Sequence, residues 1–219
     1  MVTITAKPAV PSKTFRRDLV ALERARILTS ARTHVFIAFD LKWLEGNPDT
    51  ILEIGVATLD LRPGFLRPAC YPPSTWAIRP HHYIISENRR LVNTRHAKSN
   101  RRGFKFGNSY IARQAKVIAS INKMLSCYPS EQIALVGQFL SRDLRKLREL
   151  GVEIPVEWPA FDVANLDRAV CRAVNGRRRG LGVICDGLEV SYFRPDKLGN
   201  AGNDAWFAMA AFAAMCCLY

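Results

Sequence analysis

The sequence predicts an α/β fold in which a mixed β-sheet carries helices on both faces. Three short apolar segments, rich in β-branched and aromatic residues, follow one another in the first half of the chain, as is typical of strands joined in series. Further along, segments with helical spacing of apolar residues alternate with short strand-like segments. The chain then closes on an alanine-rich apolar segment that reads as a buried helix.

The first half of the chain predicts one helix and then three strands. Residues 14–30 carry apolar side chains at roughly helical spacing. Residues 35–40 (VFIAFD) form a short β-branched and aromatic run, so we expect a buried strand. Asn47-Pro48-Asp49 predicts a turn before a second strand over residues 50–61. A third strand is expected within residues 74–85, which gives the sheet an antiparallel start.

The second half predicts helices and short strands in alternation. Residues 89–110 are polar, basic and loop-like, and an amphipathic helix begins at Ile111. The elements expected after it are a strand over 132–137, a helix over 141–150, a short strand over 160–166, a short helix over 180–188 and a closing helix from about residue 200. The order β-β-β-α-β-α-β-α-α is that of an RNase H-like fold. This domain would span residues 34–219, behind an N-terminal extension, residues 1–33, that contains the first helix.

Composition and charge narrow the classes of function. The chain has 219 residues, 48% of them hydrophobic, which suits one folded domain and argues against disorder. No apolar run is long enough to span a membrane and no secretory signal opens the chain, so we expect an intracellular protein, cytoplasmic or nuclear, with no membrane partner. The first 33 residues also fit a mitochondrial presequence, against which Asp18 and Glu23 count.

The balance of charged residues points to an anionic partner. The chain carries 32 Lys and Arg against 19 Asp and Glu, a net charge of +13. Such a field attracts polyanions, with nucleic acid the first candidate, although a basic surface without such a partner is the alternative. The 6 cysteines show no C-x-x-C pairing and no histidine partners at metal spacing, which indicates a reducing compartment and no zinc site.

Three aspartates stand at the ends of predicted elements. Asp40 follows the first buried strand, Asp143 opens a helix after a strand, and Asp204 opens the last helix. If they converge at one edge of the sheet, their carboxylates could hold two divalent metals for phosphodiester hydrolysis. The alternative is that Asp143 and Asp204 are ordinary acids at helix N-termini and that Asp40 simply ends a strand.

Three segments together resemble the DEDD superfamily of 3′–5′ exonucleases, of the DEDDh type, in a fungal branch of exonuclease-like domains. They are VFIAFDLKWLE…ILEIGVATLDL, IALVGQFLSRDLRKLRELGV and LGNAGNDAWFAMAA, and HHYIISENRRLVN…FKFGNS extends the likeness to about residues 34–219. The resemblance implies an RNase H-like fold, two-metal chemistry with Mg²⁺ or Mn²⁺, and a nucleic-acid substrate. It assigns the metal to Asp40, Asp143 and Asp204.

Two departures from the family pattern fall on catalytic positions. The first motif, Asp-x-Glu in the family, reads Asp40-Leu41-Lys42, which places an ammonium group on the same strand face as Asp40. That ammonium repels a divalent cation and could pair with Asp40 or Asp204 instead. The histidine that serves as general base in the family is replaced by Gly199. The four histidines lie elsewhere, and we expect His81 and His82 at the rim of the third strand.

Basic segments supply candidate contacts to nucleic acid. The loop over 89–110 interleaves cationic residues with Phe104, Phe106 and Tyr110, a composition typical of a surface that binds phosphates and stacks bases. The alternative is that the two phenylalanines pack beneath the loop. The candidate residues are Arg89, Arg90, Arg95, Lys98, Arg101, Arg102 and Lys105 in this loop, Arg142 beside Asp143, and Arg177, Arg178 and Arg179.

The sequence leaves three functions open. The first is a pseudo-exonuclease that binds RNA or DNA with lost or strongly reduced nuclease activity, and needs no cofactor. The second is an active 3′–5′ exonuclease that uses Mg²⁺ or Mn²⁺ in a reduced site. The third is a protein-interaction scaffold on an exonuclease fold, in which the partner is another protein. The two departures and the charge favour the first.

Overall fold

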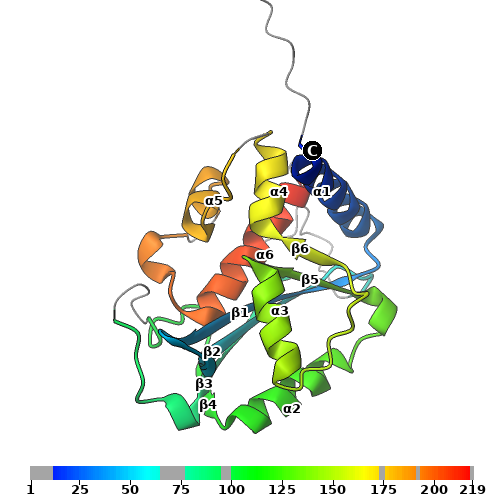
Figure 1. The fold of residues 1–219 in the computed structure, drawn as a ribbon. Coiled ribbons are helices and arrows are strands. Elements are labelled where there is room, and N and C mark those ends of the chain that lie inside the picture. The colour runs from blue at the N-terminus through cyan, green and yellow to red at the C-terminus, as the bar shows by residue number, and fades with distance from the viewer. Residues whose placement is uncertain (1–11, 65–76, 95–99, 173–175, 191–192, 218–219) are drawn as a thin grey trace, which may run out of the picture.

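In the computed structural model a mixed sheet of six strands, in the order β4-β3-β2-β1-β5-β6, lies between two layers of helices (Figure 1). The structure describes residues 12–64, 77–94, 100–172, 176–190 and 193–217. The strands are β1 (Val35–Leu44), β2 (Asn47–Asp60), β3 (Arg79–Ile85), β4 (Ser109–Ala112), β5 (Ile133–Gly137) and β6 (Ala160–Asp162). β1, β2 and β3 are antiparallel in series, whereas β4, β5 and β6 each run parallel to their inner neighbour. The predicted RNase H-like α/β fold is therefore confirmed.

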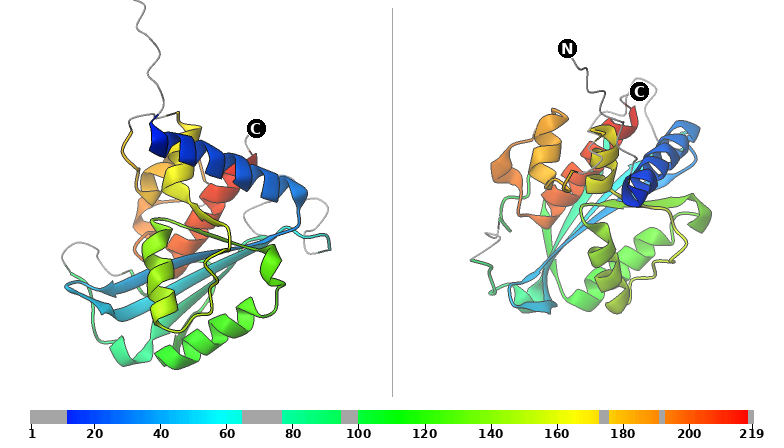
Figure 2. Two further views of the ribbon diagram at one scale, coloured as in Figure 1. Left: turned by 45° about the vertical axis from the view of Figure 1, so that its right-hand side comes forward. Right: turned by 45° about the horizontal axis from the view of Figure 1, so that its top comes forward.

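The helices divide between the two faces of the sheet (Figure 2). One layer contains α1 (Lys13–Ala31), α4 (Val163–Val170), α5 (Leu181–Gly187) and α6 (Ala201–Cys217), and the other contains α2 (Gln114–Leu125) and α3 (Leu140–Glu149). Short 3₁₀ turns lie at η2 (Ser86–Asn88), η3 (Ser130–Gln132) and η4 (Pro195–Lys197). A separate apolar core lies between each face of the sheet and the helices that cover it. Among the described helices, none is both long and apolar enough to cross a membrane.

Helix α6 lies directly on the sheet, which fixes the position of its first turn. Its residues are buried almost throughout, as an apolar helix in a core requires. A Cβ atom at Gly55 of β2 would lie 1.8 Å from the carbonyl oxygen of Ala201, so only glycine permits this approach. The head of α6, with Asp204, is thereby pressed against β1, β2 and β3.

The helix of the predicted N-terminal extension belongs to the folded body. α1 packs on α4 and α6 and buries Phe15, Leu22 and Ala25. Arg168 of α4 donates a hydrogen bond to the buried Asp18 at 2.6 Å. Residues 1–11 lie outside the described part of the chain.

The prediction of a turn at Asn47-Pro48-Asp49 is wrong. These residues begin β2, and the connection from β1 is made by Glu45 and Gly46. Gly46 adopts φ +81°, a left-handed conformation that glycine enters without the steric cost of a Cβ atom. Turn composition alone therefore misplaced the hairpin by about two residues.

Two other boundaries differ from the prediction because short strands precede helices. Ile111 was expected to open a helix, yet it lies in the edge strand β4 and α2 starts at Gln114. The segment 160–166 was expected to be a strand, but only Ala160–Asp162 pairs with β5. The Asp162 carboxylate accepts a hydrogen bond from the Ala164 amide at 3.0 Å, and this cap starts α4.

Candidate functional site

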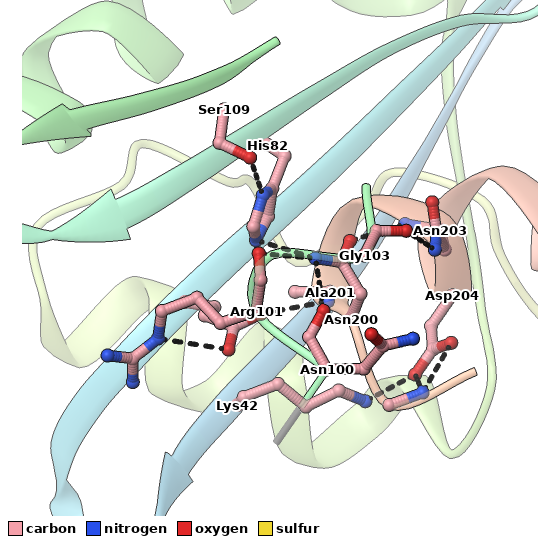
Figure 3. A network of polar contacts seen from close by, with 12 residues as sticks. Lys42, His82, Asn100, Arg101, Gly103, Ser109, Asn200, Ala201, Asn203 and Asp204 are labelled. Atoms are coloured by element: carbon pink, nitrogen blue, oxygen red, sulfur yellow. Dashed lines mark hydrogen bonds and ion pairs between the residues drawn. The ribbon is translucent and has the colours of Figure 1, made fainter. Parts of the chain in front are cut away.

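The ammonium group of Lys42 joins two of the predicted aspartates. Its Nζ lies 2.8 Å from Asp40 Oδ2 and 2.5 Å from Asp204 Oδ2. Asp40 and Lys42 are separated by one residue of β1, so their side chains point to the same face of the sheet. The first turn of α6 brings Asp204 to this face. Figure 3 shows the Lys42 side chain extended toward the Asp204 carboxylate. The pairing predicted as Asp40 or Asp204 therefore involves both.

The environment favours the charged form of Lys42. Burial disfavours the ammonium, but the charges of Asp204 and Asp40 and their hydrogen bonds outweigh it and raise the pKa of Lys42. Burial also raises the pKa of Asp40, an effect that the charge of Lys42 opposes. The site thus holds a permanent cation supplied by the chain.

Asp143 lines the same cavity without touching the ammonium. It lies in the first turn of α3 and is almost fully buried. Burial raises the pKa of Asp143 to about 7, against the charge of Lys42 and a backbone hydrogen bond from Leu41. Asp40, Lys42, Asp143 and Asp204 line one cavity of about 260 Å³. The structure therefore brings the three aspartates to one place on the sheet.

Gly199 has a backbone role at the site. Its amide N–H donates to both carboxylate oxygens of Asp204, at 3.2 and 3.3 Å. Its φ of +82° lies in the left-handed region, where any residue with a Cβ atom is strained. The backbone at position 199, where the sequence resemblance leads us to expect the general base of the family, is thus shaped for glycine. His82 cannot substitute for that base from the strand rim, because it is completely buried.

The residues of this site do not fit a divalent metal. The family generally uses such ions, which take oxygen ligands at close range. Here Asp40 and Asp204 both turn an oxygen to the Lys42 ammonium, so a cation already fills the space between them. In the described part of the chain no group of three or more His, Cys, Asp or Glu side chains is arranged to hold a metal.

A second buried polar network holds the head of α6 (Figure 3). The Glu53 carboxylate lies 3.0 Å from His82 Nε2 and accepts hydrogen bonds from Arg101 Nε at 3.3 Å and from the Ala201 amide at 3.2 Å. The other ring nitrogen of His82 lies 2.8 Å from the hydroxyl of Ser109. Glu53 thus connects β2, β3 and the loop before β4 to α6. The prediction that His82 lies at the strand rim is wrong.

The pKa of Glu53 reflects this network. Burial alone would raise it, but the hydrogen bonds from His82 and Ala201 and the charges of His82 and Arg101 prevail and lower the pKa of Glu53. The contacts of Glu53 are those of an anchor. Strand periodicity could not reveal this role, because the partners His82, Arg101 and Ala201 come from other segments of the chain.

The loop over residues 100–110 is fastened to the same helix. Asn203 of α6 donates to the Gly103 carbonyl at 2.9 Å and accepts from the Lys105 amide at 3.0 Å. Phe106 stacks on Trp206 with ring centroids 4.0 Å apart, and Phe104 lies 5.3 Å from the His82 ring. The two phenylalanines therefore pack beneath the loop, which was the alternative to base stacking.

The predicted cationic contacts separate into internal and exposed side chains. Arg101 donates to the carbonyls of Arg89 and Leu91 as well as to Glu53, so its donors serve the fold. Arg179 binds Asp167 through two hydrogen bonds. The side chains that remain exposed are Arg89, Arg90, Arg102, Lys105, Arg142, Arg177 and Arg178. Arg95 and Lys98 lie outside the described residues.

Two guanidinium–aromatic pairs stand at the cavity. Arg142 lies over the Trp43 ring at 4.0 Å, and Arg178 lies over the Phe139 ring at 4.7 Å. Trp43, Phe139 and Arg142 line the cavity beside the aspartates. Phe139 is 43% exposed and adopts φ +53°, a strained conformation for a bulky side chain. Sequence reasoning missed both aromatic residues, although an aromatic residue between a strand and a helix, as in GQFLSRD, was a usable signal.

Comparison with known proteins places most of the chain in one family. The DEDDh model described as "DNA polymerase III subunit epsilon-like, C-terminal domain" matches residues 35–215. A curated relative, "Good for full DBP5 activity protein 2" of Saccharomyces cerevisiae, is 24% identical over 234 residues, which cover 95% of this chain and 40% of the relative. The chain thus spans less than half of that fungal protein.

Among solved structures, the RNase domain of the yeast Pop2 protein is similar, with a TM-score of 0.48 and 12% identity. That match covers 95% of this chain and 89% of the other.

Proposed function

Because the chain belongs to the DEDDh family of DNA polymerase III subunit epsilon-like domains, we propose that it binds nucleic acid with its own exonuclease activity lost or strongly reduced. The observation that carries this proposal is the Lys42 ammonium, 2.8 and 2.5 Å from the carboxylates of Asp40 and Asp204. Those carboxylates are therefore engaged by a cation that cannot activate water as a metal does.

The proton chemistry of hydrolysis is also unsupported. A water that attacks a phosphodiester needs a base within hydrogen-bond reach to accept its proton. At position 199 the chain offers an amide N–H that donates to Asp204. Asp143 has a raised pKa of about 7 and could accept a proton, but in the cavity that it lines the Lys42 ammonium is paired with both Asp40 and Asp204. Loss of the metal site and of the base together leaves binding as the retained property.

The rim of the cavity supports binding of a nucleic-acid backbone and its bases. The guanidinium groups of Arg142 and Arg178 are already held over aromatic rings. Each side chain therefore loses less conformational freedom when it contacts a phosphate. The half-exposed Phe139 offers an apolar surface for a base beside them. The net charge of +13 draws a polyanion to the chain. RNA and DNA remain equal candidates.

One observation favours the alternative of an active exonuclease. Asp40, Asp143 and Asp204 still line one cavity, so displacement of Lys42 would leave three carboxylates facing it. A protein-interaction scaffold is the outcome if no nucleic acid binds.

The test combines cleavage and binding on the same substrates. Single- and double-stranded RNA and DNA labelled at the 3′ end are incubated with the protein and Mg²⁺ or Mn²⁺, and binding is followed by fluorescence anisotropy at several salt concentrations. We expect salt-sensitive binding and no product. Cleavage that Asp204→Asn abolishes would establish the active enzyme instead, and the absence of salt-sensitive binding would favour the scaffold.

Matched variants locate the binding surface. Arg142→Gln and Arg178→Gln should each weaken binding and lower the slope of log affinity against log salt by about 0.7 for a single strand, as loss of one phosphate contact does. Arg145→Gln serves as the control, because Arg145 lies on α3 with its side chain 76% exposed and paired with Glu149. Equal effects of all three substitutions would show that the rim has no special role.

A further inference from the structure

We propose that Lys42 is the resident cation of this site, and that its removal leaves a carboxylate pair that takes up a divalent metal ion. The inference rests on the proposed function in one respect, namely that the native site works without a metal. The ammonium then has a structural role, and the ligand of the site without Lys42 is a hard divalent cation such as Mn²⁺.

The geometry around the ammonium is that of a small bridging cation. One nitrogen atom contacts Asp40 Oδ2 at 2.8 Å and Asp204 Oδ2 at 2.5 Å, and these oxygens come from β1 and α6, which are remote in sequence. Small divalent ions are commonly held by one or two carboxylates, with water completing their coordination. The adjoining cavity of about 260 Å³ has room for several waters, at about 30 Å³ each. The two carboxylates are therefore sufficient protein ligands once the ammonium is gone.

The carboxylates at this point need a positive partner or a proton. Asp40, Asp143 and Asp204 share the cavity with Lys42, and Arg142 is the other cationic residue that lines it. The guanidinium of Arg142 is stacked on Trp43. Without Lys42 the carboxylates of Asp40 and Asp204 would face each other in a largely buried space with no positive partner in contact. Such an arrangement must bind protons or an external cation, because an uncompensated buried charge is costly.

The site should keep its shape when Lys42 is replaced, because the head of α6 has a second anchor. Lys42 pairs in register with Glu53 on the adjacent strand. Glu53 holds the Ala201 amide of α6, and Asn203 holds the loop at Gly103. Figure 3 shows the contacts of Asn200, Ala201 and Asn203 beside the contact of Lys42 with Asp204. Asp204 therefore stays opposite Asp40 without the ammonium.

The experiment measures Mn²⁺ binding without any nucleic acid, so its outcome is independent of whether the protein binds or cuts RNA or DNA. Thermal unfolding of the full chain is followed in EDTA and in increasing Mn²⁺, and bound Mn²⁺ is counted by electron paramagnetic resonance. The variants are Lys42→Ala and Lys42→Met, which keeps the apolar stem, each also combined with Asp204→Asn. Lys42→Arg is the matched control that keeps the charge.

We expect the wild type and Lys42→Arg to unfold at the same Tm in EDTA and Mn²⁺. Lys42→Ala and Lys42→Met should have a lower Tm in EDTA, and a Tm about 5–10 °C higher when free Mn²⁺ is a hundredfold above its Kd. Lys42→Ala and Lys42→Met should each bind one Mn²⁺, and the additional substitution Asp204→Asn should abolish this binding.

Three results would overturn the proposal. One is an Asp204-dependent rise in the Tm of the wild type with Mn²⁺, since Lys42 would then not exclude the metal. Another is the absence of bound Mn²⁺ in both Lys42 variants. The third is a failure of both variants to fold even in Mn²⁺, because the ion should then replace the ammonium.

Discussion

Replacement of Glu53 by alanine tests the anchor that positions the candidate site. The side chain is 2% exposed and contacts His82 Nε2, Arg101 Nε and the Ala201 amide at 3.0, 3.3 and 3.2 Å. Its removal leaves a guanidinium and a buried amide without their partner. Breaking a buried charged pair in this way costs about 3–5 kcal/mol. Because a domain of this size loses about 2–4 °C in Tm for each kcal/mol lost from the free energy of unfolding, the Tm should fall by roughly 6–20 °C.

Urea unfolding followed by circular dichroism measures the loss of stability directly, and a double-mutant cycle with Arg101→Ala measures the shared part. We expect a coupling of about 1 kcal/mol or more between Glu53 and Arg101, since charged hydrogen bonds in contact are not additive. Glu149→Ala is the control, because Glu149 is exposed on α3 and its ion pairs should contribute under about 1 kcal/mol. A loss of stability for Glu53→Ala no larger than that of the control would refute the role of Glu53 as an anchor.

Three other substitutions test separate parts of the structure. Asp143 has a raised pKa of about 7, so its contribution to stability is fully present below about pH 4 and is lost as the pH rises through about 7. Asp143→Asn should therefore flatten the decline of Tm between about pH 4 and 8. An unchanged pH profile would contradict the argument that burial raises this pKa. Gly199→Ala should cost about 1–2 kcal/mol in urea unfolding because φ is +82°, and a neutral result would show that this backbone can relax. Gly55→Ala should unfold the protein or displace α6, since the new Cβ would lie 1.8 Å from the Ala201 oxygen, and native hydrogen exchange in α6 would contradict that contact.

The sequence predicted those parts of the site that depend on local periodicity. Alternation along a strand is enough to place Asp40 and Lys42 on one face, and a cluster of small polar residues before an apolar run is enough to place Asp204 in the first turn of α6. The three antiparallel strands and the closing helix followed from the same patterns. These features need no knowledge of which elements touch.

The remaining features depend on contacts between distant segments. The role of Glu53 requires the register that puts His82 beside β2 and the approach of Ala201, and neither leaves a periodic signal. Phe104 and Phe106 resemble exposed stacking residues in sequence because their packing partner, the head of α6, lies about a hundred residues away. The pairing of Trp43 with Arg142 and of Phe139 with Arg178 was missed for the same reason, since each guanidinium comes from a different element than the ring beneath it.

Anomalous X-ray scattering from crystals of the wild-type protein soaked in Mn²⁺ would identify the cation that lies between Asp40 and Asp204. We expect no manganese peak there, and density for the Lys42 ammonium within about 3 Å of both carboxylates, the separation of a charge-assisted hydrogen bond. A manganese peak at that point, with the Lys42 side chain turned away, would contradict this expectation and restore the metal-dependent exonuclease as the better explanation.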